Sequence, residues 1–168
     1  MSKIRACDEQ DIPEIDAIIN EAASVYRGVI PADCWHEPYM TRSDLVAEIE
    51  AGIEFWGVDD AGALVGIMGI QPVRDVTLIR HAYVRPAHQG RGIGSALLRQ
   101  LAAGVNGPLL VGTWAAARWA IRFYERHGFA LVASDTEKNH LLDLYWNIPP
   151  RQRDTSVVLT RVRESDGS

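Results

Sequence analysis

In the first fifty residues, the hydrophobic and polar positions alternate with the period of a β-strand in one segment and with the period of an α-helix in two others. Asp11 stands where a helix N-cap is expected, with Pro13 in the first turn and Glu14 three residues on, as in a capping box. The expected elements are a strand over residues 4–7, a helix over 12–23, an irregular aromatic-rich stretch over 26–40, and a helix that begins after Thr41 or Ser43 and stops at Gly52.

From residue 54 the pattern changes to the strand type. Three runs of this kind are separated by the turn signals at residues 59–62 and 74–75. Because the connections are short, neighbouring strands pair in opposite directions. The sequence therefore predicts an antiparallel meander of three strands over residues 54–58, 63–71 and 76–84.

The second half returns to helix and strand in alternation. The break Asn106-Gly107-Pro108 separates the next helix from a short apolar strand. A connection over residues 135–155 is long for a hairpin, which usually needs two to five residues. The expected elements are a helix over residues 92–104, a strand over 109–113, a helix over 116–127 closed by Gly128, and strands over 129–133 and 156–162.

Composition narrows the class of protein. The chain has 168 residues, 47% of them hydrophobic and 23% charged, which suits one globular domain over residues 1–162 with a C-terminal tail over 163–168. The net charge of −5 gives no reason to expect a nucleic-acid partner. We expect no signal peptide, no membrane span, and a cytoplasmic location. Cys7 and Cys34 lack disulfide or metal-ligand spacing, and no metal is expected.

Three glycines in five residues, Gly90, Gly92 and Gly94, lead from the third strand of the meander into a helix. Glycine lets the backbone approach a ligand, and a helix N-terminus offers free N–H donors and partial positive charge, so this junction suits a phosphate. A Walker A loop is excluded because no Lys follows the glycines. The spacing also differs from a dinucleotide-binding Gly-x-Gly-x-x-Gly, which would follow a parallel strand. The pattern that fits is Gln/Arg-x-x-Gly-x-Gly/Ala, with Gln89 in its first position.

Two motifs resemble a known family. The run Tyr83-Val84-Arg85-Pro86-Ala87-His88-Gln89-Gly90-Arg91-Gly92-Ile93-Gly94 is similar to motif A of the GNAT superfamily of acyl-CoA-dependent N-acetyltransferases. The run Ala120-Ile121-Arg122-Phe123-Tyr124-Glu125-Arg126-His127-Gly128-Phe129 is similar to the family's Ala-x-x-Phe-Tyr-x-x-x-Gly-Phe. The order of the expected elements matches the family from Ile4 to Val162.

The resemblance implies an α+β fold: a mixed, mostly antiparallel seven-stranded sheet flanked by helices, with two parallel central strands that splay apart. It also implies that acetyl-CoA is the co-substrate and lies between those strands. The chain departs from the family at Ala117, where members often carry Asn. The residues expected to bind the cofactor are Ala82, Tyr83 and Val84 along the pantetheine arm, and Gln89, Gly90, Arg91, Gly92, Ile93, Gly94 and Ser95 at the pyrophosphate.

Acetyl transfer to an amine needs a base and a partner for the leaving thiolate. The resemblance assigns Tyr124 to the thiolate. A thiol near pKa 8.5 is more acidic than a phenol near 10, so full proton transfer is uphill by roughly 2 kcal/mol and a hydrogen bond would serve as well. Histidine is the residue type whose side chain most readily exchanges a proton near neutral pH, so His81 is the candidate base, with a hydrogen-bonded structural role as the alternative. Glu54, Glu37, His36 or a chain of water molecules are further alternatives.

The expected activity is transfer of an acetyl group from acetyl-CoA to a primary amine by direct attack in a ternary complex. The alternative is a protein that binds acyl-CoA without turnover, as a sensor or partner-binding module. The acceptor is a small-molecule or peptide amine, and a homodimer is possible. Tyr26, Trp35 and Trp146 are candidate acceptor contacts, whereas Trp56, Trp114 and Trp119 are expected in the core.

Overall fold

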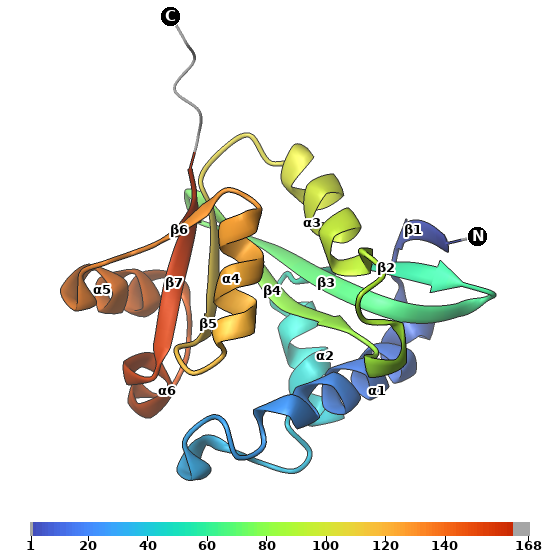
Figure 1. Cartoon of the computed structure of the whole chain (residues 1–168), viewed down its shortest axis with the longest axis horizontal. Helices are drawn as coiled ribbons and strands as arrows, with labels where there is room; N and C mark the ends of the chain where they lie inside the picture. Colours follow the sequence, from blue (N-terminus) through green and yellow to red (C-terminus); the bar gives the residue numbers. More distant parts are fainter. Residues whose placement is uncertain (1, 163–168) are drawn as a thin grey trace, which may run out of the picture.

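The computed structural model describes residues 2–162, so the predicted tail over 163–168 lies outside the described residues. Within them the chain forms one seven-stranded sheet with helices on both faces (Figure 1). The strands are β1 (Ser2–Ala6), β2 (Glu54–Asp60), β3 (Ala63–Val73), β4 (Val76–Val84), β5 (Leu109–Trp114), β6 (Phe129–Leu131) and β7 (Ser156–Arg161). The helices are α1 (Ile12–Ala22), α2 (Arg42–Glu50), α3 (Ile93–Ala103), α4 (Arg118–Arg126), α5 (Asp135–Tyr145) and α6 (Pro150–Asp154).

The strand order is β1-β2-β3-β4-β5-β7-β6, and every neighbouring pair is antiparallel except β4 and β5. The predicted meander is confirmed as β2, β3 and β4. The long connection over residues 135–155 folds into helices α5 and α6, which the sequence patterns above do not predict. This arrangement is the mixed, mostly antiparallel seven-stranded sheet that the resemblance to the GNAT superfamily implies.

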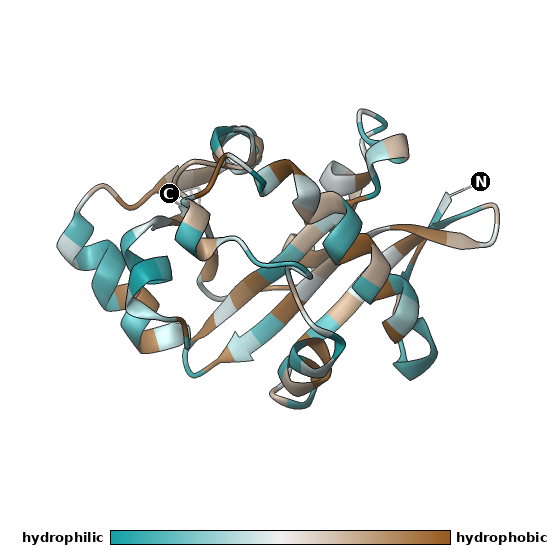
Figure 2. Cartoon of the chain, turned by 90° about the horizontal axis from the view of Figure 1, so that it is seen from below, coloured by the Kyte–Doolittle hydropathy of each residue, from teal (hydrophilic) through white to brown (hydrophobic). Residues whose placement is uncertain are grey.

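Adjacent residues on one strand point to opposite faces of the sheet, and the core is divided accordingly. Leu64 of β3 packs with α1 and α2, whereas Val65 packs with α3 and α4. Figure 2 shows hydrophobic segments concentrated in the strands through the middle of the molecule, while the helices alternate between hydrophobic and hydrophilic residues. The sheet therefore lies between two helical layers, with one part of the core on each of its faces.

The predicted capping role of Asp11 is wrong in its partners. Asp11 occupies the N-cap position of α1 but makes no side-chain cap bond there. Its carboxylate instead accepts hydrogen bonds from the Asp8 backbone N–H and from the Arg5 guanidinium, each at 2.8 Å. Asp8 caps the preceding 3₁₀ turn, so the capping box lies three residues earlier than expected. The Asp11 carboxylate is engaged by Arg5 and Asp8, so it does not cap the first turn of α1.

The parallel pair β4 and β5 separates partway along its length. Residues 77–79 of β4 pair with residues 109–111 of β5, and no pairing follows beyond Ile79 and Val111. The C-terminal halves of the two strands, residues 80–84 and 112–114, are not paired with each other and form a fork. The predicted splaying of the central strands is confirmed.

Strand β4 also carries a bulge inside this fork. Gly69 of β3 pairs with Arg80, and Ile67 pairs with Tyr83, so Met68 faces both His81 and Ala82. His81 has a φ of 56°, which is unusual for a residue other than glycine. Bulges redirect side chains and often lie beside active sites. Here the bulge turns His81 and Ala82 toward different sides of the strand.

Candidate active site at the fork

Three cavities meet around the fork between β4 and β5. We call them the loop-side cavity, of about 330 Å³, the inner cavity, of about 110 Å³, and the outer cavity, of about 520 Å³. Tyr26 and Tyr83 line both the loop-side and the inner cavity. Residues lining both the inner and the outer cavity are Tyr39, Arg80, His81, Trp114, Ile148 and Gln152. The three spaces therefore follow one another across the sheet.

The glycine-rich loop presents free backbone donors at the start of α3. Gly92 is the N-cap residue with φ of 77°, and no side chain caps the helix. The first backbone hydrogen bond of the helix runs from the Ala96 N–H to the Gly92 carbonyl, at 3.0 Å. Within residues 2–162, the N–H groups of Ile93, Gly94 and Ser95 have no acceptor in the protein. This turn is a ready anion site.

The same loop leaves space on its outer side. Gly90 has φ of 81°, and a Cβ built on either Gly90 or Gly92 would meet no atom within 4 Å. The Gln89 side chain donates a hydrogen bond to the Val84 carbonyl at 3.2 Å, so it supports the loop from within. Arg91 is exposed, with its guanidinium 3.9 Å from the Asp60 carboxylate. The open backbone cradle therefore leaves room for a phosphate group.

The loop-side cavity runs from this cradle along β4 and α4. It contains Ala82, Tyr83 and Val84, the residues expected beside the pantetheine arm, along one wall, and Gln89 and Gly94 at its loop end. Gly90, Arg91, Gly92, Ile93 and Ser95 form the adjoining loop and helix start but do not line the cavity. The ten predicted cofactor residues thus lie together, half along the cavity and half in the cradle.

The opposite wall of the loop-side cavity belongs to α4, and Trp119 is part of it. The prediction that Trp119 is a core residue is wrong, because it is 45% exposed. Its ring stacks on Tyr26 with ring centroids 6.0 Å apart, and it lines the cavity together with Phe123, one helical turn later. The i, i+4 spacing of these two rings was the sequence signal that could have revealed it.

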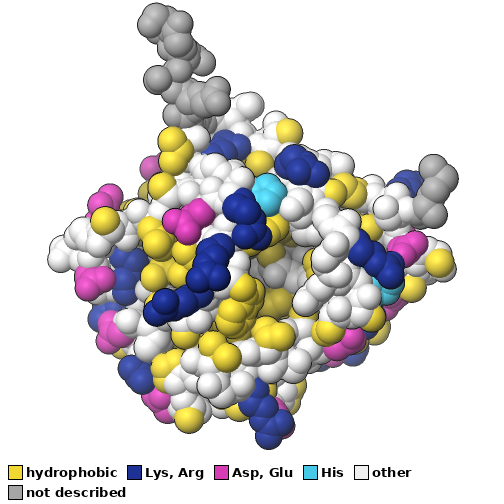
Figure 3. All heavy atoms as spheres, viewed as in Figure 1, with side chains coloured by type: hydrophobic (Ala, Val, Ile, Leu, Met, Phe, Trp, Pro, Cys, Tyr) yellow, Lys and Arg dark blue, Asp and Glu magenta, His cyan; other side chains and the backbone are white. Residues whose placement is uncertain are grey.

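Arginines border the same wall. Arg118, Arg122 and Arg126 follow one another at intervals of four along α4, and all three are exposed. None of them makes an ion pair with another residue of the described chain, and Arg126 lines the loop-side cavity. Figure 3 shows the dark blue side chains in a line over α4, beside a hollow with hydrophobic walls. This border favours a ligand that carries phosphate groups.

Tyr124 lies on the inner face of α4, on the loop-side cavity. It is 5% exposed, and its ring is wedged edge-on between Phe123 and Phe129. Burial raises its pKa above the ordinary value for tyrosine. Its hydroxyl has no hydrogen-bond partner within residues 2–162 and is not sealed from the cavity. Tyr124 is therefore a neutral phenol with a proton to donate.

His81 lies on the other side of β4, where it lines the inner and outer cavities. Its Nε2 is 2.6 Å from the Glu48 Oε2, and Arg80 donates to the Glu48 Oε1 at 3.0 Å. The imidazole also stacks on Phe55, with ring centroids 6.1 Å apart. Burial disfavours the charge of Glu48, but the hydrogen bond from His81 and the nearby cations outweigh it and hold the pKa of Glu48 below its ordinary value. Glu48 is therefore a carboxylate that holds the His81 ring.

Glu48 was missed by the sequence analysis. It lies on α2, three residues after the fully buried Leu45, so it faces the sheet rather than the solvent. An acidic residue on the apolar face of a helix was the available signal. The sequence could not show that His81, 33 residues away, would meet it.

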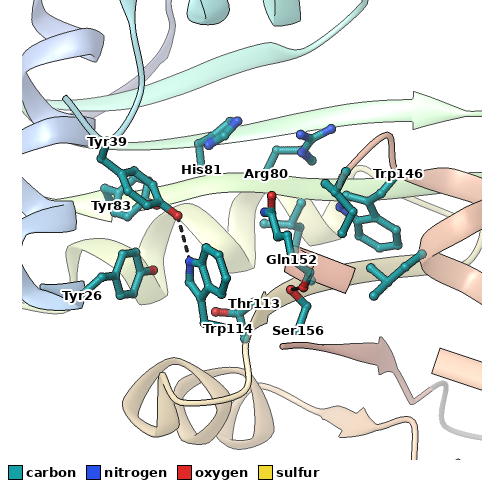
Figure 4. A pocket seen from close by; sticks show the side chains of 14 residues that line it. Tyr26, Tyr39, Arg80, His81, Tyr83, Thr113, Trp114, Trp146, Gln152 and Ser156 are labelled. Carbon is teal, nitrogen blue, oxygen red and sulfur yellow. Dashed lines mark hydrogen bonds between the residues drawn. The ribbon is translucent and has the colours of Figure 1, made fainter. Parts of the chain in front are cut away.

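Aromatic residues surround the junction of the inner and loop-side cavities (Figure 4). The Trp114 N–H donates to the Tyr39 hydroxyl at 2.8 Å. The Tyr26 ring lies 5.5 Å from that of Tyr39 and 6.4 Å from that of Tyr83. Burial raises the pKa of Tyr39 to about 12 and raises those of Tyr26 and Tyr83 as well. These four residues, the aromatic cluster, are all uncharged at neutral pH.

The predicted acceptor residues are only partly brought together. Tyr26 lies at the junction, and Trp146 lines the inner cavity. Trp35 lines none of these cavities and packs behind Tyr39, with ring centroids 5.9 Å apart. Trp114 is buried as predicted, but it also lines the inner cavity.

The alternative bases lie farther out. His36 lines the outer cavity, and Glu37 pairs with Arg27 on the exposed surface at 3.3 Å. Glu54 lines a separate cavity beside Cys7, away from the fork. Among these candidates, His81 is the residue that reaches the inner cavity.

No three or more His, Cys, Asp or Glu side chains of residues 2–162 gather closely enough to hold a metal ion. In the same range, no helix combines the length and apolar character needed to cross a membrane.

Residues 51–131 match the sequence model of the Acetyltransferase (GNAT) domain family. No curated relative matches the sequence. Among solved structures, the chain is similar to the PaiA N-acetyltransferase of Thermoplasma acidophilum in complex with coenzyme A, with 16% identity, a TM-score of 0.72, and coverage of 97% of this chain and 99% of that one.

Two other solved structures share the fold. The ribosomal-protein-S18-alanine N-acetyltransferase of Escherichia coli has 18% identity and a TM-score of 0.63, with 99% of this chain and 98% of that one covered. The N-acetylglutamate synthase of Neisseria gonorrhoeae, complexed with coenzyme A and N-acetyl-glutamate, has 25% identity and a TM-score of 0.63. The match covers 96% of this chain and 35% of that one. Residues 51–131 thus match the GNAT acetyltransferase domain in sequence, and the fold over nearly the whole chain is similar to that of N-acetyltransferases of known structure.

Proposed function

We propose that the protein is an N-acetyltransferase that moves the acetyl group of acetyl-CoA to a primary amine within a ternary complex. One observation carries the proposal. The loop-side cavity, which adjoins the phosphate cradle and contains Tyr124, meets the inner cavity at Tyr26 and Tyr83. The inner cavity contains His81, whose ring is held by the Glu48 carboxylate. Donor and acceptor can therefore approach the fork from opposite sides and react where the cavities join.

Backbone N–H groups of the glycine loop would hold the pyrophosphate of acetyl-CoA, and the free edge of β4 over residues 82–84 would hold its pantetheine arm. The unpaired N–H groups of Ile93, Gly94 and Ser95 and the open space at Gly90 and Gly92 support this placement. The arginines of α4 add positive charge along the same groove. The bound co-substrate supplies the activated acetyl group.

Tyr124 faces the donor side of the fork. Its hydroxyl is free, neutral and close to the junction, so it can donate a hydrogen bond to the sulfur of the departing thiolate. A positioned donor of this kind typically contributes a factor of about 10 to 1,000 in rate. The buried ring contacts with Phe123 and Phe129 hold that hydroxyl in place.

His81 faces the acceptor side. An alkyl amine has a pKa of about 10.4 and arrives mostly protonated, so a group on this side must take up a proton before or during attack. The imidazole can do so, directly or through water, and the Glu48 carboxylate both orients the ring and stabilises the positive charge that it gains. Glu48 acts here as a positioning residue.

A coupled assay tests the proposal. Release of free thiol from acetyl-CoA is followed across a panel of primary amines, with the acetylated product confirmed by mass. Binding of acetyl-CoA is measured separately by calorimetry. We expect amine-dependent thiol release. Tight binding of acetyl-CoA without turnover of any amine would point instead to a sensor that binds acyl-CoA.

A further inference from the structure

We propose that the acceptor site selects primary amines whose amine-bearing carbon carries no carboxylate. The inference rests on the proposed transferase function and concerns the chemical class of its acceptor. It follows from where the reacting nitrogen must lie and from the charges that surround that point.

The reacting amine must reach the junction of the inner and loop-side cavities, between Tyr26 and Tyr83. When the amine-bearing carbon carries a carboxylate, the carboxylate carbon is only two bonds from the nitrogen. It would therefore lie within the aromatic cluster of Tyr26, Tyr39, Tyr83 and Trp114 (Figure 4). The position of an α-carboxylate is thus fixed by the reaction itself.

No positive charge faces that point from the cluster. The three tyrosines are neutral, since burial raises the pKa of each. The Trp114 N–H is already bonded to the Tyr39 hydroxyl at 2.8 Å, so it is not available to a substrate carboxylate. A carboxylate buried without a cationic partner is strongly disfavoured relative to water.

The cations nearest to the cluster are already occupied. Arg80 donates to Glu48 at 3.0 Å and to the Gln71 side chain at 3.1 Å, and its side chain is only 17% exposed. His81 contacts the second oxygen of Glu48 at 2.6 Å. Glu48 thus already pairs with both of the side chains that could otherwise have paired with a substrate carboxylate.

The outer cavity does not compensate for this. Its walls carry three carboxylates, those of Asp33, Asp44 and Glu48, and two guanidinium groups, those of Arg80 and Arg151. Arg151 pairs with Asp33 at 2.8 Å, while Asp44 has no ionic partner among the described residues. The approach to the site is therefore slightly acidic, which favours an ammonium and repels an anion.

Matched amines test the inference. The first set is 2-phenylethylamine, L-phenylalaninamide and L-phenylalanine, which present a hydrogen, a neutral amide or a carboxylate at one position. The second set, 1-butylamine, norvalinamide and norvaline, repeats the comparison without a ring, in case a ring is too large for the inner cavity. The purified protein is assayed with saturating acetyl-CoA. Values of kcat/KM are expressed per concentration of unprotonated amine, because the amino groups differ in pKa.

We expect the amine and the amide of at least one set to exceed the acid by roughly 10- to 1,000-fold. An amide as slow as the acid, with a fast amine, would assign the selectivity to bulk rather than charge and overturn the inference. An acid equal to or faster than its amide would also overturn it. Turnover of none of the six would contradict the transferase itself, and the selectivity with it.

Discussion

The Nε2 of His81 and the Oε2 of Glu48 lie 2.6 Å apart, although one residue belongs to strand β4 and the other to helix α2. The contact is supported on both sides, since Arg80 binds the second oxygen of Glu48 and Phe55 stacks on the imidazole. The backbone of His81 adopts a φ of 56° to reach it. Strained backbone of this kind costs about 1–3 kcal/mol and persists at sites where the surrounding structure enforces it.

A double-mutant cycle tests whether the two residues act together. Glu48→Gln should lower kcat about 10- to 100-fold, because the imidazole loses both its orientation and its counter-charge. His81→Ala should lower kcat at least as much. In the His81→Ala background, Glu48→Gln should add little, since there is no ring left to position.

The control for this cycle is Glu50→Gln, an exposed carboxylate on the same helix without an ion pair within residues 2–162. It should keep the kcat of the wild type. Losses for Glu48→Gln and His81→Ala that multiply fully in the double variant would mean that the residues act independently.

The lowered pKa of Glu48 predicts a dependence of stability on pH. A carboxyl group whose pKa is lower in the folded state stabilises the fold above its unfolded pKa, near 4.3, and loses that contribution as pH falls through the folded value. Urea unfolding from pH 7 to pH 3 should therefore show wild type more stable than Glu48→Gln at neutral pH. The difference in unfolding free energy should shrink below about pH 4. A difference that grew toward acid would show that Glu48 is not stabilised as the anion.

Tyr124→Phe should lower kcat about 10- to 1,000-fold while the affinity for acetyl-CoA changes little. The phenyl ring keeps its contacts with Phe123 and Phe129, so only the hydroxyl is lost. Steady-state kcat and calorimetric affinity, measured on the same preparation, separate the two effects. Tyr145→Phe is the matched control, because the Tyr145 hydroxyl bonds to Asp75 on the surface at 2.7 Å. Equal kcat values for the two variants would remove Tyr124 from the reaction.

Two glycines with the same backbone conformation test the phosphate cradle. Gly92 and Gly28 both have φ of 77°, and a Cβ at either would meet nothing within 4 Å. Alanine should therefore cost each about 1–2 kcal/mol of stability through the same backbone strain. Only Gly92→Ala should weaken acetyl-CoA binding, by roughly tenfold or more, because its Cβ would narrow the loop that meets the pyrophosphate.

Arg91→Ala extends this comparison to a side chain. Arg91 is exposed, with the carboxylate of Asp60 3.9 Å away, so its charge is screened by solvent. Its removal should weaken binding by less than Gly92→Ala does. Calorimetric titration with acetyl-CoA measures all three variants, and equal losses for Arg91→Ala and Gly92→Ala would show that side-chain charge dominates the site.

Short-range patterns in the sequence determined the meander, the glycine loop and the place of Tyr124. Each depends on residues within about twenty positions of one another: alternation in the strands, φ > 0 at Gly92, and the spacing of Phe123, Tyr124 and Gly128. Local conformational preference and local periodicity are readable without knowing how the elements pack. The resemblance to the GNAT motifs extended this reading to the order of the whole sheet.

Only the tertiary structure decided what faces the fork. Glu48 meets His81, Tyr26 meets Tyr39 and Tyr83, and Trp119 stays exposed rather than entering the core. These relationships join α2, β4, α4 and the aromatic-rich stretch after α1. They depend on how the helices pack on the two faces of the sheet and on the bulge that redirects His81. Contacts between distant segments are determined by the close packing of the whole interior, so they produce no periodic pattern in the sequence.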